Sequence, residues 1–177
     1  MGITPADNTT EGLPEGWTLT TFGNACEINP PKARKDSLPA DAPVTFIPMP
    51  AVEAEAGAIT APQERPFADV RKGFTSFREN DVIMAKITPC MENGKAAIAR
   101  RLKNGLAFGS TEFHVLRPTE VVLPEFVYHF IRQASYRKAA EAEMTGSVGQ
   151  KRVPQWFIES SELPLPPLYE QIRIVKR

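Results

Sequence analysis

The chain has 177 residues, of which 42% are hydrophobic and 24% are charged, and its formal net charge is zero. These values are typical of one soluble globular domain that can bury a core without a disulfide or metal staple. Its two cysteines, Cys26 and Cys90, form no CxxC pair, which favours a reduced, intracellular setting. Since no apolar run approaches the roughly 18 residues that span a bilayer, and the first residues lack the parts of a signal peptide, we expect a cytoplasmic protein with no membrane partner.

The charges are unevenly distributed along the chain. Residues 1–70 carry four basic and ten acidic side chains, residues 71–103 carry eight and three, and residues 104–177 carry nine and eight. Local basic charge matters more than the total for a polyanionic partner. The middle segment, with net +5, is therefore a candidate for contact with nucleic acid. A solvated surface with scattered lysines accounts for the same asymmetry.

The N-terminal part begins with a polar stretch, residues 1–12, that we expect to be disordered. Residues 17–21 alternate apolar and polar side chains, which predicts a first strand. Residues 22–28 are compatible with a short helix that ends at the Asn-Pro-Pro of residues 29–31. Amino-group DNA methyltransferases carry a similar tripeptide, followed by an aromatic residue that stacks on the flipped base. Here Lys32 follows, and the chain lacks a glycine-rich turn that could hold a methyl donor, so the tripeptide is interpreted as a helix stop.

The middle of the chain is expected to supply most of the strands. Residues 44–52 are apolar but interrupted by two prolines, which confines them to a sheet edge or an irregular extended run. Residues 81–87 and 96–99 are predicted as a central strand pair, because the connector between them contains Asn-Gly, a strong hairpin signal. Residues 108–118 alternate apolar and polar side chains and are predicted as a further strand.

A helix is predicted from residue 124 to residue 144, with Pro124 in its first turn. An apolar stripe at helical spacing is expected to face the core, formed by Phe126, Val127, Phe130, Ile131 and Ala134. His129 lies near this stripe, and His114 lies in a predicted strand. Neither has a second histidine or cysteine at ligand spacing, so both are interpreted as structural and no metal site is expected.

Two polar loops carry the residue types that contact nucleic acid. The first joins residues 81–87 to residues 96–99, and the second, residues 145–153, contains two glycines, two hydroxyls, one amide and two cations. Exposed glycine amides can bind phosphate, glutamine suits adenine, and lysine and arginine suit guanine or phosphate. A solvent-exposed loop with incidental charge is the alternative. The residues predicted to bind DNA are Lys86, Thr88, Asn93, Lys95, Ser110, Thr111, Ser147, Gln150, Lys151 and Arg152.

The roles within this set are expected to differ. Gln150 is predicted to read a base, beside Lys151 and Arg152, because a side-chain amide both donates and accepts hydrogen bonds. Asn93 precedes a glycine and is expected to serve the turn. Contacts to the DNA backbone are predicted for Lys86, Lys95, Ser110, Thr111 and Ser147.

The C-terminal part predicts an extended segment, residues 162–167, followed by a helix. Leu168, Ile172 and Val175 fall at i, i+4 and i+7, the beginning of a heptad-like seam. A helix of about three turns needs more length or a partner to be stable in water. We expect this seam to lack a partner within the chain, so that the helix either frays or self-associates with a neighbouring molecule.

Five longer motifs, each present once, follow one another along the chain: LPEGW (13–17), AKITPCMENGKAA (85–97), GSTEFHVLRP (109–118), TGSVGQKRV (145–153) and LPLPPLYEQIRIV (163–175). Together they resemble the specificity subunit of type I restriction–modification enzymes. The resemblance implies that residues 13–167 form a target-recognition domain that reads one half of a split DNA sequence. It implies an α+β fold, with a curved mixed sheet and flanking helices, followed at residues 168–177 by the start of a conserved spacer helix.

The resemblance also implies which partners the chain has and which chemistry it lacks. The specificity subunit of this family does not catalyse, so no catalytic residue and no cofactor of its own are expected. S-adenosylmethionine would be bound by methyltransferase subunits, through which restriction subunits are positioned. This sequence departs from the family pattern in having one recognition domain and a helix that ends almost at once, as in a fragment or half-subunit. One alternative is that the chain is the recognition part of a fused restriction–methylation enzyme, although the short leader argues against it. The other is a protein-interaction domain without a DNA role.

Overall fold

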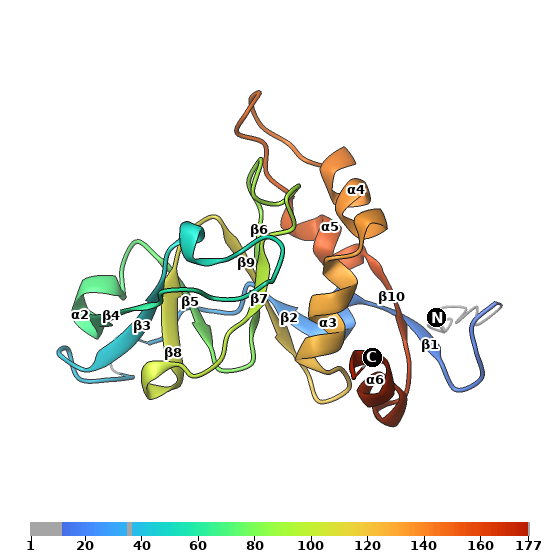
Figure 1. Ribbon diagram of the computed structural model, residues 1–177, viewed down its shortest axis with the longest axis horizontal. Coiled ribbons are helices and arrows are strands. Elements are labelled where there is room, and N and C mark those ends of the chain that lie inside the picture. The colour runs from blue at the N-terminus through green and yellow to red at the C-terminus, as the bar shows by residue number, and fades with distance from the viewer. Residues whose placement is uncertain (1–11, 35–36, 177) are drawn as a thin grey trace, which may run out of the picture.

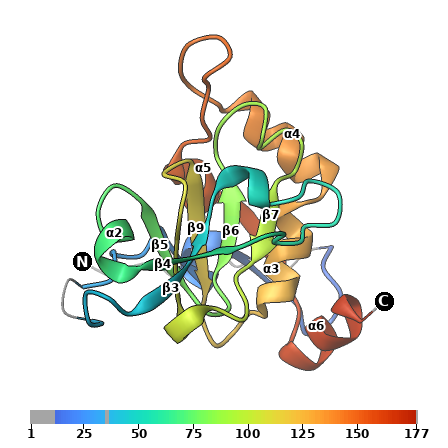
Figure 2. The same ribbon diagram turned by 60° about the vertical axis from the view of Figure 1, so that its left-hand side comes forward.

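The computed structural model describes residues 12–34 and 37–176, so the predicted leader lies outside the described residues except for Gly12. The strands form three sheets, two with four strands and one with two (Figure 1). An outer sheet, a central sheet and the helices α3 and α4 lie as successive layers, which Figure 2 shows from left to right. The α+β class is confirmed, although the strands are divided among three sheets rather than gathered in one.

The central sheet has the strand order β2-β9-β6-β7, and its neighbouring strands are antiparallel. Its strands are β2 (Cys26–Ile28), β9 (Phe113–Pro118), β6 (Val82–Ala85) and β7 (Ala96–Ile98). The predicted hairpin of β6 and β7 is confirmed, with Val82 opposite Ile98 and Met84 opposite Ala96. Residues 86–95, named the β6–β7 loop below, connect the two strands.

Both faces of the central sheet are buried. On one face, Met84 and Leu116 belong to the core that includes α3, and on the other, Ile83 and Val115 pack with residues of the outer sheet. His114 is buried as well, although alternation along this segment predicted one polar face. A sheet that is covered on both faces buries consecutive residues, so a pattern of period two underestimates the burial of β9.

The outer sheet has the strand order β4-β3-β8-β5. Its strands are β4 (Gln63–Pro66), β3 (Pro43–Ile47), β8 (Leu106–Gly109) and β5 (Thr75–Arg78). β3 and β8 run parallel, and the other pairs are antiparallel. The edge position predicted from the prolines is wrong, because β3 lies between β4 and β8. Pro48 and Pro50 follow the strand, the latter within the short helix η1 (Met49–Ala51), so neither removes a donor from the ladder. The short α2 (Phe67–Val70) packs against this sheet.

Two predicted elements are divided in the structure. Residues 108–118 contribute the end of β8 and all of β9, which lie in different sheets and are joined by the turn at residues 110–112. The helix predicted over residues 124–144 is two helices, α3 (Pro124–Ile131) and α4 (Ala134–Ala142), because Gln133 has a non-helical backbone with ψ of 138°. Within the predicted stripe, Phe126, Val127 and Ile131 are buried, Phe130 is partly buried and Ala134 is exposed.

The tripeptide at residues 29–31 ends a strand rather than a helix. The predicted helix is only α1 (Phe22–Ala25), and the chain continues directly into β2. Asn29 follows β2 with a left-handed φ of 49°, and its side-chain oxygen accepts a hydrogen bond from the Val115 amide at 3.0 Å. Asparagine tolerates this conformation because its short side chain can bond locally. The structural interpretation of the tripeptide is therefore correct, but the element that it ends was wrong.

The C-terminal helix α6 (Leu168–Val175) is anchored on the domain. It follows α5 (Gln155–Ser160) and β10 (Glu162–Leu165), which pairs with β1 (Thr18–Thr21) and confirms the first predicted strand. The fully buried Gln171 accepts a hydrogen bond from the Leu123 amide at 2.8 Å and donates to the carbonyls of Val121 and Pro166. None of the described helices has the length and apolar character needed to cross a membrane.

The predicted seam of α6 is divided between the core and the surface. Val175 packs against the main core cluster, so the expectation that the whole seam lacks a partner within the chain is wrong for this residue. Leu168 and Ile172 remain 43% and 40% exposed. Fraying or self-association of the helix stays a prediction.

Candidate nucleic-acid interface

The β6–β7 loop and the loop of residues 145–153 lie side by side at one end of the molecule (Figures 1 and 2). The Thr88 amide donates to the Lys151 carbonyl at 3.0 Å, and the Val153 amide donates to the Lys86 carbonyl at 2.9 Å. The Thr88 hydroxyl also donates to the Lys151 carbonyl, at 3.2 Å. Backbone bonds of this kind make the two loops a single polar surface, although 50 or more residues separate them in the sequence.

The β6–β7 loop is held in place by its own turns and by helix α4. The Asn93 amide donates to the Pro89 carbonyl at 3.0 Å, and the Gly94 amide donates to the Met91 carbonyl at 2.8 Å. Only Gly94 of the predicted Asn-Gly pair has a positive φ, of 76°. Arg137 of α4 donates to the Glu92 carbonyl at 2.7 Å. A side chain at position 94 would press on this arginine, since a Cβ there would lie 3.1 Å from its Nη1.

The second loop is a small hairpin with a sharply defined tip. At its base, Thr145 and Arg152 exchange backbone hydrogen bonds of 3.0 and 2.8 Å. At its tip, the Gln150 amide donates to the Ser147 carbonyl at 2.9 Å. Gly149 has a φ of 77°, and a positive φ at the third residue alone is the signature of a type II turn. The loop therefore ends in a hydrogen-bonded turn that presents residues 147–150 at its tip.

An ion pair fixes the second loop to the turn between β8 and β9. The Arg152 guanidinium donates to both carboxylate oxygens of Glu112, at 2.9 and 2.8 Å, and also to the Gln150 carbonyl at 2.9 Å. Its bond to Arg152 holds the pKa of the Glu112 carboxyl below its ordinary value, against the opposing effect of burial. Bidentate arginine–carboxylate pairs are strong and directional. In this structure, Arg152 positions the loop, and its predicted contact with DNA stays a prediction.

His114 connects the base of the second loop to the N-terminal part of the chain. Its Nε2 lies 2.8 Å from the Val153 carbonyl, which can only accept, so Nε2 carries the proton. Its Nδ1 then accepts from the Asn29 side-chain amide at 3.0 Å. Burial lowers the pKa of His114, and the nearby Lys86 acts in the same direction. The structural role that the sequence predicted for His114 is confirmed, whereas His129 is exposed.

Acid should destabilise the protein through His114. An unperturbed histidine has a pKa of about 6.5, and the folded-state pKa lies below it, so the unfolded state binds more protons. The stability contributed by neutral His114 is therefore complete above about pH 6.5 and is lost as the pH falls from there towards the folded-state pKa. Denaturant titrations at pH 7.5 and pH 5 should show a drop for the wild type and a smaller drop for His114→Gln. The exposed His129→Gln serves as control, and equal drops in all three proteins would contradict the assignment.

The remaining predicted residues differ in whether their side chains already form hydrogen bonds within the chain. Ser110 accepts a hydrogen bond from the Glu112 amide at 3.1 Å, and Lys95 donates to the Met49 carbonyl at 3.3 Å, towards the outer sheet. The other predicted residues have no side-chain hydrogen bond or ion pair to any described residue. They are Lys86, Asn93, Thr111, Ser147, Gln150 and Lys151. The turn between β8 and β9, which contains Ser110 and Thr111, also meets the two loops here, since the Lys86 amide donates to the Glu112 carbonyl at 2.9 Å.

Sequence reasoning missed two residues at this surface. A pocket of about 610 Å³ lies between the loops and α4, and its lining includes Thr88, Glu92, Lys138, Val148 and Lys151. Lys138 brings a cation from α4 to the loops, and a signal for it was its position on the exposed side of a predicted helix. Val148 lies at the tip of the second loop, and no sequence signal marked it because its side chain has no polar atom.

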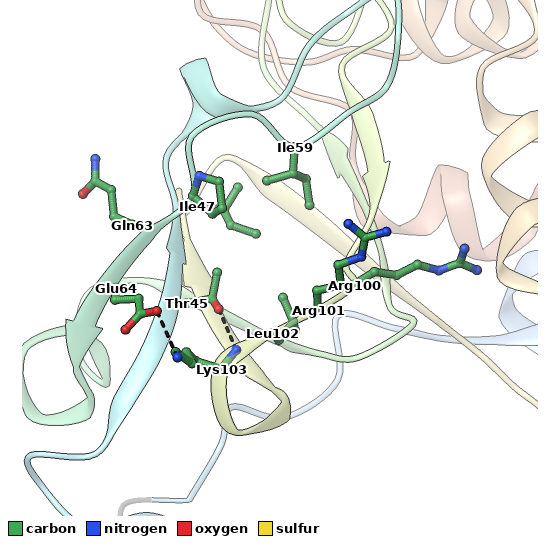
Figure 3. A pocket seen from close by; sticks show the side chains of 10 residues that line it. Thr45, Ile47, Ile59, Gln63, Glu64, Arg100, Arg101, Leu102 and Lys103 are labelled. Atoms are coloured by element: carbon green, nitrogen blue, oxygen red, sulfur yellow. Dashed lines mark hydrogen bonds and ion pairs between the residues drawn. The ribbon is translucent and has the colours of Figure 1, made fainter.

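A second group of cations lies at a different place, in the turn that follows β7. Arg100, Arg101 and Lys103 line a pocket of about 410 Å³ whose inner wall includes Ile47 and Leu102 (Figure 3). Arg100 pairs with a glutamate of α3, and Lys103 pairs with one of β4 at 3.2 Å. The positive segment is thus divided between two surfaces, and much of the charge in this turn is locally neutralised.

An α+β scaffold that brings three polar segments together at one end has the architecture of a recognition domain. The family model of the type I restriction modification DNA specificity domain matches residues 14–177, and the chain belongs to this family. The chain is 42% identical over 166 residues to the type I restriction enzyme EcoAI specificity subunit and 40% identical over 164 residues to that of EcoEI, both from Escherichia coli. These matches cover 93% and 92% of this chain but only 28% and 27% of the relatives' length.

Solved structures agree with this assignment. The HsdS subunit from Thermoanaerobacter tengcongensis superposes with a TM-score of 0.71 and 25% identity, over 93% of this chain and 41% of that one. A chain solved to describe the structural basis underlying complex assembly and conformational transition of the type I R-M system gives a TM-score of 0.73 and 26% identity, over 92% of this chain and 41% of that one. The S subunit from M. genitalium, at a TM-score of 0.53 and 15% identity over 90% and 37%, shares the fold.

Proposed function

We propose that this chain recognises one half of a split DNA target as the specificity component of a type I restriction–modification system. The observation that carries the proposal is the convergence of the β6–β7 loop, the β8–β9 turn and the loop of residues 145–153 on one surface. This surface combines cations that attract phosphate with amides and hydroxyls that can read base edges. Family membership and the names of the Escherichia coli relatives support the same reading.

The proposal assigns the chemistry to other subunits. The chain itself has no catalytic role and holds no cofactor, and S-adenosylmethionine is bound by methyltransferase subunits that it positions on DNA. Restriction subunits join through them. Helix α6 is the start of the spacer on which these partners assemble, and its exposed Leu168 and Ile172 are available for that contact or for self-association.

Binding to duplex DNA should weaken steeply as salt is added. If four to eight phosphates are neutralised, the slope of log affinity against log salt concentration is about −4 to −7. Fluorescence anisotropy of a labelled duplex pool between 50 and 200 mM salt would measure it. Lys86→Ala, at a predicted backbone contact, should make the slope shallower by about one. Lys72→Ala is the matched control, since this lysine is exposed in the turn between α2 and β5. No binding, or a flat salt response, would favour the protein-interaction alternative.

A further inference from the structure

The tip of the second loop carries an apolar side chain that contributes nothing to the core. Val148 is 96% exposed, far more than the other exposed large hydrophobic residues, and it lies in none of the hydrophobic clusters among the described residues. The turn that presents it is well defined, with the Ser147 carbonyl accepting from the Gln150 amide and Gly149 taking the positive φ. In Figure 1 this loop reaches beyond the rest of the domain at the top of the view.

Val148 is surrounded by groups that suit nucleic acid but cannot itself bind phosphate or a polar base edge. Ser147 precedes it and Gln150 follows it in the same turn, Lys151 comes directly after the turn, and the side chains of all three have no partner among the described residues. On the major-groove edge of the base pairs, the apolar group is the C5-methyl of thymine. An apolar tip amid hydrogen-bonding groups therefore has one complementary feature on duplex DNA.

We propose that Val148 contacts the C5-methyl group of a thymine in the major groove of the target. The inference rests on the proposed function and deepens it, because it assigns a specificity-determining residue and a base. Gln150 is in the same four-residue turn, whose ends lie within about 7 Å of each other. Stacked bases are about 3.4 Å apart along a strand, so the two residues are close enough in the chain for their side chains to reach the same or neighbouring base pairs. An adenine read by Gln150 and a thymine methyl contacted by Val148 are the two features of an A·T pair or of adjacent ones.

Insertion of Val148 between base pairs is the competing role, and the side chain does not favour it. The residues that act as wedges and kink DNA are mostly longer or ring-shaped, such as Phe, Leu, Ile, Met and Pro. The branched Val148 ends at its two methyl groups, directly on the β-carbon. Such a side chain suits van der Waals contact with a methyl group on the groove floor.

Replacing thymine by uracil removes the methyl group and leaves base pairing intact, so it tests the contact directly. The target is first selected from random duplexes with the wild-type chain, and each thymine is then replaced in turn. At one position the wild type should bind the uracil duplex about threefold to fivefold more weakly, the size expected for withdrawing one methyl group from an apolar contact. Val148→Ala should lose most of this preference for thymine over uracil, while Val121→Ala, at an exposed valine before α3, should behave as the wild type.

Each other outcome overturns a specific claim. If no thymine position matters to the wild type, or if Val148→Ala keeps the same preference for thymine over uracil, the contact is absent. If 2-aminopurine placed at that step brightens on binding of the wild type but not of Val148→Ala, Val148 is a wedge. If the wild type selects no sequence at all, the proposed function fails, and the assignment of Val148 fails with it.

Discussion

Replacing Asp81 by alanine is expected to lower the free energy of unfolding by about 3–5 kcal/mol, the usual effect of removing one partner from a buried ion pair. Asp81 is only 1% exposed. Its carboxylate accepts from Arg117 Nε at 2.9 Å, from Arg117 Nη2 at 2.8 Å and from the Arg78 amide at 2.7 Å. The substitution would leave the Arg117 guanidinium in a half-buried site without this partner.

The position of Asp81 in the fold explains why the loss should be global. Arg78 ends β5 of the outer sheet, Asp81 precedes β6 and Arg117 lies in β9, so one carboxylate connects the two large sheets. The bond to Asp81 also raises the pKa of Arg117 above its ordinary value, against the effect of burial. Chemical denaturation followed by circular dichroism would measure the change.

Glu27→Ala is the matched control for this ion pair. Glu27 approaches the same arginine at 3.7 Å, but its side chain is 53% exposed. Exposed pairs contribute about 0–1 kcal/mol, so this variant should unfold near the wild-type midpoint. A loss below 1 kcal/mol for Asp81→Ala, or equal losses for the two variants, would show that the buried pair does not join the sheets.

Local patterns predicted the features that local chemistry determines. The β6–β7 hairpin follows from two apolar runs around an Asn-Gly pair, and the structure confirms it with Val82 opposite Ile98. The first strand and the break after residue 28 follow in the same way from alternation and from proline. Each of these depends on residues within about ten positions of one another, where sequence spacing and spatial distance agree.

Elements that depend on distant partners were predicted less well. Strand β9 is buried on both faces because the outer sheet and α3 cover it from opposite sides, and neither layer is visible in its own sequence. Strand β3 tolerates its neighbouring prolines because they fall just beyond its last paired residue. The division of the long helix at Gln133 has no proline or glycine to announce it.

The candidate site shows the same difference between features set by local sequence and contacts between distant residues. Residue types in the two polar loops predicted that both would face one partner, and hydrogen bonds between Thr88 and Lys151 bring them together. The ion pair of Arg152 with Glu112 was not predicted, because it joins residues 40 positions apart. Composition alone cannot separate an arginine that supports a loop from one that is free to contact DNA.

The structure adds a reason, beyond the sequence, to favour Gln150 as the residue that reads a base. Its backbone is held at both ends, since its amide donates to the Ser147 carbonyl and its carbonyl accepts from Arg152. Its side chain is exposed and has no hydrogen bond within the described part of the chain. Truncating the side chain should therefore leave the loop intact. The effect on binding would then report on the amide group itself.

Gln150→Ala is expected to weaken binding to the preferred duplex by about 1–3 kcal/mol, roughly fivefold to 150-fold, and to change binding to a scrambled duplex little. Lys86→Ala should weaken both duplexes alike, because a phosphate contact carries no sequence information. Lys86 is a better control than Lys95, whose ammonium group donates a hydrogen bond to the Met49 carbonyl that the substitution would also remove. Titrations of both variants on both duplexes at fixed salt would separate the roles. Equal weakening of the two duplexes by Gln150→Ala would move this residue from the group that reads bases to the group that holds the backbone.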